Sequence, residues 1–257
     1  MFALKKIIYQ YGIPIFGWVF NGRNKLVNVI YYHDVVEGKG ETYMRTNIDV
    51  FKRHMDFIAN NGFETVRFDD LNSKDSLSFV RKKVLIAFDD GWLSNYTEIY
   101  DYMKSKRLKY NIFLAVKEIG TNPDYLTWDQ IRLMHGEGFV GFGTHTFNHS
   151  DVSDIGKVNT AVEFGMADSI FSHELGYQPK DFCYPYGYYS EASNLYIEEN
   201  TEYSRIYTSS MMYSYKQNGK IVFGRNAISN DDSLHVLKCK ANGYYNVLKT
   251  LLLRYGK

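Results

Sequence analysis

Residues 84–91 read Val84-Leu85-Ile86-Ala87-Phe88-Asp89-Asp90-Gly91 and place two acids at the end of an apolar run. The run is typical of a buried strand. Two adjacent carboxylates at the end of such a strand are costly to desolvate unless a metal ion, a cation or several hydrogen-bond donors compensate. Asp-Gly is also ordinary turn chemistry. This stretch alone therefore leaves a strand-end turn and an active site equally open.

Strand and helix patterns alternate along the chain on both sides of this stretch. Short runs rich in β-branched and aromatic residues predict strands at 27–32, 63–68, 84–88, 110–116, 139–143, 182–184, 205–208 and 221–225. Helical spacing and capping signals predict helices at 47–61, 96–106, 127–135, 157–175, 190–199 and 233–240. The alternation favours parallel strands covered by helices, and therefore an α/β fold.

The composition narrows the class of protein. The 257 residues are 45% hydrophobic, and the net charge is +1 with acidic and basic residues interspersed. Such a chain can bury a sizeable core, which argues against disorder. The charge pattern lacks a basic stripe, which argues against nucleic-acid binding. The two cysteines, Cys183 and Cys239, give no disulfide framework and no Cys-x-x-Cys metal motif. The oligomeric state stays open.

Polar side chains recur directly after the predicted strands. They are His33, the Asp89-Asp90 pair, His145 and the Pro185-Tyr186-Gly187 turn. Because the carboxyl ends of the strands meet at one face of an α/β barrel, we expect these groups to lie together there.

His145 begins a His-x-x-x-His sequence that ends at His149. On a helical turn, residues i and i+4 lie on one face, so that both imidazoles can reach one ion. Together with one carboxylate of the Asp89-Asp90 pair they would form a three-ligand site with room for water, as catalytic zinc requires. The second carboxylate would then be free to act as a base.

These motifs, in this order, resemble those of the polysaccharide deacetylase family, which is carbohydrate esterase family 4 and contains the NodB homology domain. The shared motifs are Phe-Asp-Asp-Gly at 88–91, Thr-His-Thr-Phe-Asn-His at 144–149 and Tyr-Pro-Tyr-Gly at 184–187. Residues 30–35, 51–70 and 127–129 resemble one branch, which includes deacetylases of the biofilm polymer poly-N-acetylglucosamine. The resemblance spans about residues 29–225 and implies a distorted (β/α) barrel of the NodB-homology type.

The resemblance also implies roles for individual residues. Asp89 matches the catalytic base, and Asp90, His145 and His149 match the metal ligands. The backbone N–H of Tyr186 matches the donor to the oxyanion. The family's metal is usually zinc, and cobalt or nickel is also accepted.

Two positions depart from the family pattern. Cys183 stands where the family commonly has an arginine that orients the base, so the orientation of Asp89 must come from elsewhere or be looser. A C-terminal Leu-x-His motif, whose histidine is the general acid, is missing. In the biofilm-polymer branch a histidine near the N-terminus takes that role, which makes His33 the candidate acid.

Residues 1–24 are expected to form a hydrophobic or interfacial segment ahead of a catalytic domain at 25–257. Lys5 and Lys6 precede an apolar stretch, as in a signal peptide, but no Ala-x-Ala-like cleavage site follows. A segment that lies on a membrane surface and a helix packed on the domain itself both fit. We therefore expect a cytoplasmic enzyme, with the inner membrane face as one place for it and a secreted or anchored enzyme as the alternative.

The predicted function is a metal-dependent hydrolase. It would remove N-acetyl groups from N-acetylglucosamine-type sugars in a bacterial surface polysaccharide or its lipid-linked precursor, so its partner is an N-acetylated glycan. Two alternatives stay open. One is a hydrolase of another acyl group on a sugar, an O-acetyl ester or a formamide. The other is an inactive glycan-binding relative, in favour of which only Cys183 stands.

Overall fold

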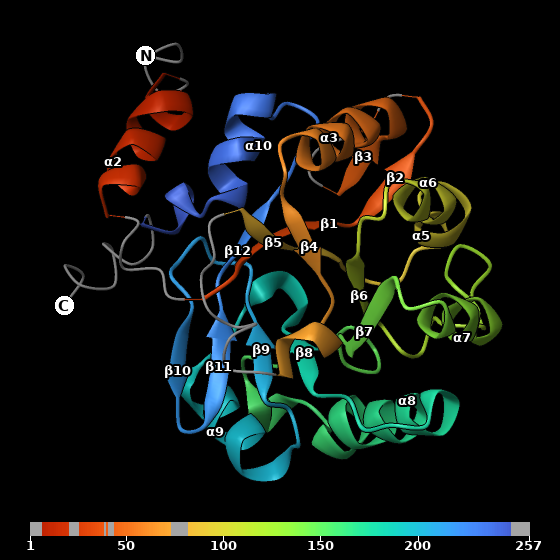
Figure 1. The fold of residues 1–257 in the computed structure, drawn as a ribbon. Helices are drawn as coiled ribbons and strands as arrows, with labels where there is room; N and C mark the ends of the chain where they lie inside the picture. The colour runs from red at the N-terminus through yellow and green to blue at the C-terminus, as the bar shows by residue number, and fades with distance from the viewer. Residues whose placement is uncertain (1–6, 21–25, 39, 41–43, 73–81, 248–257) are drawn as a thin grey trace.

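The computed structural model describes residues 7–20, 26–38, 40, 44–72 and 82–247 (Figure 1). Its strands are β1 (Asn28–Tyr32), β2 (Asp34–Val36), β3 (Arg45–Asn47), β4 (Glu64–Val66), β5 (Lys83–Phe88), β6 (Tyr110–Leu114), β7 (Val140–Thr144), β8 (Asp181–Cys183), β9 (Arg205–Tyr207), β10 (Tyr215–Gln217), β11 (Lys220–Phe223) and β12 (Arg225–Ala227).

The strands form one large sheet and a separate pair, β2 with β3, and the helices lie mostly outside the large sheet (Figure 1). The α-helices are α2 (Ile13–Phe20), α3 (Ile48–Asn60), α5 (Ser94–Thr97), α6 (Tyr100–Ser105), α7 (Trp128–Gly136), α8 (Ala167–Leu175), α9 (Glu191–Asn200) and α10 (Leu234–Ala241). Shorter turns are the π-helices η1 (Ile8–Gly12) and η5 (Ala161–Met166), and the 3₁₀ helices η3 (Asp69–Asn72), η4 (Ile155–Lys157), η6 (Pro185–Gly187) and η7 (Tyr244–Asn246).

The main sheet has the strand order β10-β11-β9-β8-β7-β6-β5-β1-β12, with β4 also paired to β5. All of its pairs are parallel except β10 with β11. Only Gly224 separates β11, which pairs with β9, from β12, which pairs with β1. The chain therefore links the two ends of the order and the sheet curls round. The α/β class and the distorted barrel predicted from the sequence are confirmed.

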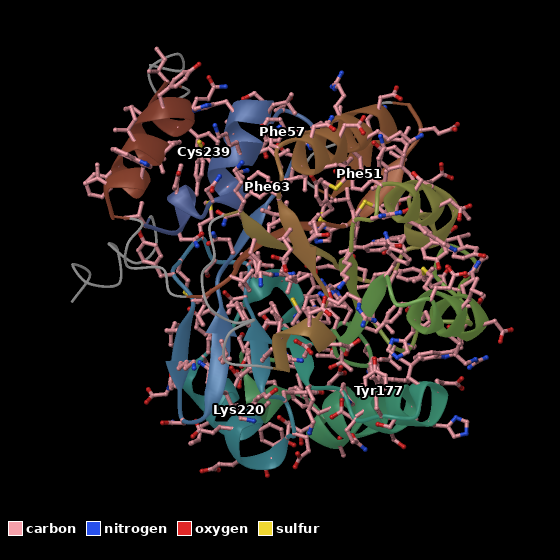
Figure 2. The ribbon with its side chains drawn as sticks, in the orientation of Figure 1. Phe51, Phe57, Phe63, Tyr177, Lys220 and Cys239 are labelled. Carbon is pink, nitrogen blue, oxygen red and sulfur yellow. The ribbon has the colours of Figure 1, made fainter. Side chains whose placement is uncertain are left out.

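The side chains of successive strand residues pack into two different hydrophobic cores. In β1, Ile30 and Tyr32 pack with the helices, whereas Val29 and Tyr31 belong to a second cluster with Phe113. Because side chains alternate across a strand, this split gives the sheet one apolar face toward the helices and one toward the barrel interior. In the outer core, the ring of Phe51 on α3 lies 5.8 Å from that of Phe88 (Figure 2).

Local capping chemistry begins the predicted helices where the sequence indicated. Asn47 accepts hydrogen bonds from Asp49 N and Val50 N at the start of α3. Thr127 and Gln130 form the predicted capping box of α7. Side-chain oxygens at these positions satisfy backbone N–H groups that have no partner within the helix.

Two predicted elements are divided in the structure. The helix predicted at 96–106 is broken between α5 and α6. The strand predicted at 221–225 is split at Gly224, where a Cβ atom would lie 2.1 Å from the carbonyl oxygen of Met212. Only a glycine fits so close to that backbone, so the chain changes strand partners there.

The predicted domain boundary between residues 24 and 25 lies outside the described residues. On the N-terminal side of this boundary, α2 packs beside α10 on the outside of the barrel (Figure 1). None of the helices in the described ranges is long and apolar enough to cross a membrane.

Candidate functional site

The residues predicted to carry the chemistry converge on one cavity of about 100 Å³ at the carboxyl ends of the strands. Its lining includes all six of them, namely His33, Asp89, Asp90, His145, His149 and Tyr186. Strand register explains the convergence. Tyr32 of β1 pairs with Phe88 of β5, so the residues that follow these two lie side by side, and the backbone N–H of Asp89 donates to Tyr32 O at 3.1 Å.

Asp90, His145 and His149 form a group that fits a metal ion. Their ligand atoms lie within 4.8 Å of one another. Asp90 Oδ1 is 3.3 Å from His149 Nε2 and 3.7 Å from His145 Nε2. This buried oxygen accepts a hydrogen bond from no residue that the structure describes. A buried carboxylate oxygen that faces two imidazole nitrogens is a donor set suited to zinc.

Neighbouring groups fix two of these ligands. Trp92 Nε1 donates to Asp90 Oδ2 at 3.0 Å, which leaves Oδ1 directed to the histidines. His145 Nδ1 lies 2.7 Å from the carbonyl oxygen of Cys183, to which it donates. The proton therefore sits on Nδ1, and Nε2 presents its lone pair to the cavity.

The prediction that His145 and His149 share a helical turn is wrong. They lie in an irregular loop after β7, in which Thr146 (φ +65°) and His149 (φ +57°) adopt left-handed backbone conformations. The loop is held by backbone hydrogen bonds from Val116 to Thr146 O and from Lys117 to Phe147 O. The two imidazoles thus meet through a strained loop and not through helical periodicity.

The buried carboxylate of Glu163 supports the same loop and was missed by the sequence reasoning. It accepts hydrogen bonds from Asn148 N at 3.0 Å, from Asn148 Nδ2 at 2.8 Å and from Ser150 Oγ at 2.8 Å. The sequence offered one signal for Glu163, because this acid falls on the apolar side of the helix pattern at 157–175. Its contacts place it behind the loop that carries His145 and His149.

Asp89 is held by an arginine that comes from the last strand. Arg225 donates from Nη1 to Asp89 Oδ1 at 2.7 Å and from Nη2 to Oδ2 at 2.8 Å. Its Nε donates to Thr208 O at 2.9 Å, and its guanidinium lies 4.1 Å from the ring centre of Tyr31. Arg225 is fully buried, in register with Val29 on the inner face of the sheet.

This pair resolves the departure at Cys183. A guanidinium does orient Asp89, but it enters from β12 and not from β8. The sequence offered one signal, an arginine directly after an apolar strand, for which either a structural ion pair or a place at the active face was open. The structure shows an ion pair at the edge of the cavity.

Burial and charge set the protonation of the cluster. Burial alone would raise the pKa of Asp89, but Arg225 outweighs it and holds that pKa below its usual value. For Asp90, burial is likewise outweighed by the imidazoles of His149, His145 and His33, so its pKa is lowered. Burial lowers the pKa of His145 to about 4. At neutral pH both acids are ionised and His145 is neutral, as a ligand must be.

His33 and Tyr186 border the cavity from two other strand ends. His33 Nε2 lies 3.8 Å from Asp89 Oδ2. Tyr186 has φ +58°, and its ring packs edge-on against His149 at 4.7 Å. Next to it, a Cβ atom on Gly187 would lie 2.3 Å from Ser209 Cβ, so only glycine allows the turn to sit this close to β9.

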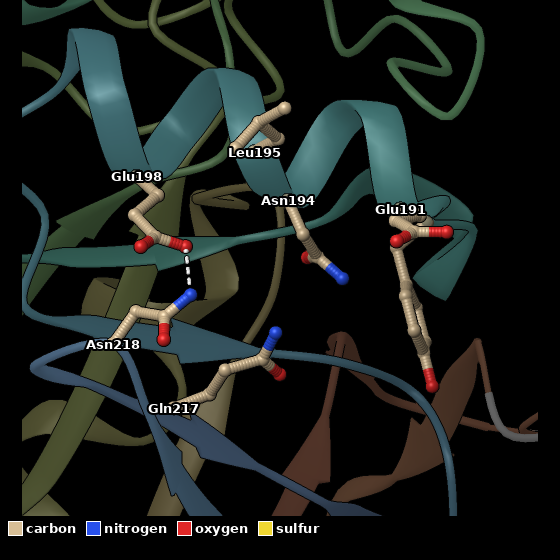
Figure 3. Close-up of a pocket in the computed structure, with 7 residues that line it drawn as sticks. Glu191, Asn194, Leu195, Glu198, Gln217 and Asn218 are labelled. Atoms are coloured by element: carbon tan, nitrogen blue, oxygen red, sulfur yellow. Dashed lines mark hydrogen bonds between the residues drawn. The ribbon is translucent and has the colours of Figure 1, made fainter.

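The described residues also contain a second group of possible metal ligands and a second hollow. Asp89, His145 and Cys183 also bring ligand atoms together, but both oxygens of Asp89 are already bonded to Arg225. A larger hollow of about 400 Å³ lies between α9 and the β10–β11 hairpin (Figure 3). The described residues that line it include no histidine or cysteine, and Asn218 Nδ2 there donates to Glu198 at 2.8 Å. Neither offers the donor set of the first group.

A model of the polysaccharide deacetylase family matches residues 78–205, the part of the chain that contains Asp89, Asp90, His145, His149 and Tyr186. The chain belongs to the polysaccharide deacetylase family. Among curated family members, it is 26% identical over 189 residues to the candidate polysaccharide deacetylase YxkH of Bacillus subtilis, over 73% of this chain and 66% of YxkH. It is 28% identical over 113 residues to a chitin deacetylase of Arthroderma benhamiae, over 44% of this chain and 30% of that protein.

Solved structures share the fold at low sequence identity. The Streptococcus pyogenes deacetylase PplD, in complex with acetate, matches with a TM-score of 0.71 and 18% identity, over 83% of this chain and 97% of PplD. IcaB from Ammonifex degensii matches with a TM-score of 0.69 and 20% identity, over 85% of this chain and 97% of IcaB. At these identities the likeness concerns the fold.

Proposed function

We propose that this chain is a metal-dependent hydrolase that removes N-acetyl groups from N-acetylglucosamine-type sugars of a bacterial surface polysaccharide or its lipid-linked precursor. One observation carries the proposal. Two adjacent acids are divided between two environments, with Asp90 facing His145 and His149 while Asp89 is bonded to Arg225. Such a division provides a metal ligand and a separate base within one cavity.

The ion would be held by Asp90, His145 and His149, and zinc suits two neutral imidazoles and one carboxylate, with cobalt or nickel as further candidates. Among the described residues none donates a hydrogen bond to the buried Asp90 Oδ1, which supports this assignment. When bound, a divalent ion lowers the pKa of water and polarises an acyl carbonyl.

Asp89 is the proposed general base. Its ionised carboxylate takes the proton from the attacking water, and Arg225 fixes its plane without occupying every lone pair. The site needs this group because water near neutral pH is a poor nucleophile toward an amide.

His33 and Tyr186 complete the proposed reaction. The backbone N–H of Tyr186 would donate a hydrogen bond to the oxyanion, a contact whose loss typically costs about 3–4 kcal/mol. An amine leaves poorly as an anion, so His33, at 3.8 Å from Asp89, would protonate the departing nitrogen. Proton uptake and release thus fall on two side chains in contact.

The relatives support the substrate class. One curated relative is named a chitin deacetylase, and a de-N-acetylase from Aggregatibacter actinomycetemcomitans shares the fold with a TM-score of 0.70 at 19% identity. The chain spans 66% and 30% of the lengths of the two curated relatives, so a whole relative's activity is not simply transferred. An inactive glycan-binding role is less favoured, because Arg225 pairs with Asp89 in place of the arginine that the family commonly has at position 183.

An acetate-release screen tests the proposal. Purified protein would be stripped of metal, reloaded with zinc, cobalt or nickel, and offered N-acetylglucosamine oligomers, O-acetylated xylan or a formamido sugar. We expect metal-dependent acetate release from the N-acetyl oligomers. Release from xylan alone, or formate from the formamido sugar alone, would instead identify another acyl group, and no release from any substrate would favour the glycan-binding role.

The proposed location is the cytoplasm, at the inner membrane face, where a lipid-linked or nascent glycan would be met. Cell fractionation of the full chain beside a form without residues 1–24 tests this. Recovery of the full chain outside the cell would support the secreted alternative.

A further inference from the structure

The helical segment formed by η1 and α2 has two apolar faces, and one of them is buried on the protein. Tyr9 and Ile13 pack with Val236, Cys239 and Tyr245, and Tyr245 Oη donates to Tyr9 O at 2.7 Å. Gly17 sits so close to η7 that a Cβ atom would lie 1.7 Å from the carbonyl oxygen of Tyr244. This face is a built contact, and it fixes the segment against α10 (Figures 1 and 2).

The opposite face of the same segment is apolar and exposed. Ile15, Trp18 and Val19 are 63%, 61% and 62% exposed, and Ile8 is also exposed. The spacing of three and four residues from Ile15 to Trp18 and Val19 makes one continuous stripe along the helix. A helix that is apolar all round is normally buried on all sides, and contiguous apolar stripes mark surfaces that bind a partner.

The sequence around the stripe indicates which partner. Residues 7–20 contain no charged side chain, while Lys5 and Lys6 precede them and Arg23 and Lys25 follow. The first acidic residue of the chain is Asp34. Lysine and arginine side chains near an anionic membrane surface are attracted to it electrostatically. Tryptophan and tyrosine favour the membrane–water boundary because one end of each ring system is polar.

We propose that the exposed face of η1 and α2 inserts into the headgroup region of an anionic lipid bilayer and holds the enzyme on its surface. The segment lies in the membrane plane and does not span it, which agrees with its length. A second protein copy would bury the apolar stripe equally well but would gain nothing from four flanking cations.

This placement orients the catalytic cavity, a consequence that rests on the proposed function. Tyr11 packs against His235 at the start of α10, and Gly17 lies against Tyr244 beyond its end, so α2 runs along the side of the barrel. The cavity lies at the carboxyl ends of the strands. A bilayer along the flank therefore leaves the cavity open beside the membrane surface, within reach of a lipid-linked glycan.

Vesicle co-sedimentation of the full chain tests the insertion. Wild-type protein would be compared with the triple variant Ile15→Ser, Trp18→Ser, Val19→Ser, using phosphatidylcholine vesicles with or without anionic phosphatidylserine. A matched control replaces Leu133, Met166 and Leu195, exposed apolar residues elsewhere, with serine. We expect wild type and control to bind the anionic vesicles at least about tenfold more strongly than they bind pure phosphatidylcholine vesicles. The triple variant should lose this binding.

Two further readouts keep the outcomes distinct. The tryptophan emission of wild type should shift to the blue on anionic vesicles, and Trp18→Phe should lose most of the shift while it still binds. Acetate release from soluble oligomers should be equal in all proteins, so a failure of the proposed activity would not affect the binding result. Equal sedimentation of wild type and triple variant would overturn the proposal, as would a wild-type dimer that the triple variant converts to monomer without any vesicle binding.

Discussion

Two buried arginine–aspartate pairs lie inside the same barrel and differ in what they can do. Arg205 donates to Asp181 from Nε and Nη2, both at 2.6 Å, and Tyr207 Oη adds a third donor to Asp181 at 2.9 Å. Arg225 and Asp89 form an equally buried two-pronged pair. The chemistry is the same, and the positions are not.

The difference lies in which end of the barrel each pair occupies. Asp181 and Arg205 are register partners at the starts of β8 and β9, where an ion pair closes the barrel. Asp89 follows the end of β5 and faces the cavity with His33 and His145. Burial dominates at Asp181 and raises its pKa, whereas cationic neighbours lower that of Asp89. The first pair lies at the strand starts, away from the cavity, and the second keeps the carboxylate of Asp89 ionised at the edge of the cavity.

Asp89→Asn should separate the two pairs most strongly. We expect turnover to fall by about 10²–10⁴-fold because the general base is lost, while the bound metal is retained on Asp90, His145 and His149. Asp181→Asn, its control, should lower stability and leave turnover per folded molecule nearly unchanged. Acetate-release kinetics and metal analysis check both, with His145→Ala as the variant that loses the metal. Retained turnover in Asp89→Asn would remove the base assignment.

Replacing each arginine with methionine should distinguish the two pairs by both stability and activity. Arg225→Met and Arg205→Met each leave a buried carboxylate without its cation, which costs about 3–5 kcal/mol in urea unfolding. Only Arg225→Met should also lower kcat and move the acidic limb of the pH–rate profile upward, because the pKa of Asp89 rises. Arg225→Lys gives the same readout in a milder form if the methionine variant does not fold. Equal kcat losses at both positions would contradict the distinction.

A third carboxylate, Asp168, shows the effect of partial burial where no cation of the described residues contributes to its pKa. Tyr203 Oη donates to it at 2.5 Å, yet burial raises its pKa to about 7 from 3.8. Its stabilising contribution is therefore complete below about pH 4 and is lost as the pH rises through about 7, by at most about 4 kcal/mol. Thermal unfolding across this range should show the decline in wild type and a flatter profile in Asp168→Asn. Parallel profiles would show that Asp168 is ionised in the fold.

Cys183→Ala should have the smallest effect. If Arg225 alone orients Asp89, removing the thiol leaves turnover within about twofold and costs about 1 kcal/mol of stability, as is typical of a small buried truncation. The carbonyl of residue 183, which accepts from His145, is unchanged. A tenfold loss of kcat at unchanged metal content would mean that the Cys183 side chain, and not only Arg225, positions the base.

Much of the fold was predictable because its signals are local. The strand before Asp89, the caps at Asn47 and Thr127 and the alternation of strands and helices are all encoded in short stretches. The position of polar groups after strands, together with the His-x-x-x-His spacing for His149, predicted the six residues that meet in one cavity. Their catalytic roles stay predictions until the variants are measured.

The features that the sequence did not predict depend on contacts between segments that are far apart in the chain. The left-handed residues Thr146 and His149 depend on packing against Val116 and Lys117, which a His-x-x-x-His spacing does not encode. The short strands β2, β3 and β10 have three residues each, too few for a periodic pattern. Arg225 meets Asp89 only because the barrel closes at Gly224, and no local pattern predicts that closure.

The closure at Gly224 also affects how the chain folds during its synthesis. Asp89 and Arg225 are separated by 136 positions in the chain. During synthesis, β1 and β5 leave the ribosome long before β12 does, so the nascent chain holds Asp89 for most of its growth without a cationic partner. Contacts of such long sequence separation form slowly. The last strand thus supplies the partner of Asp89, and a chain interrupted before residue 225 would carry all six of the predicted site residues and still lack the arginine that holds Asp89.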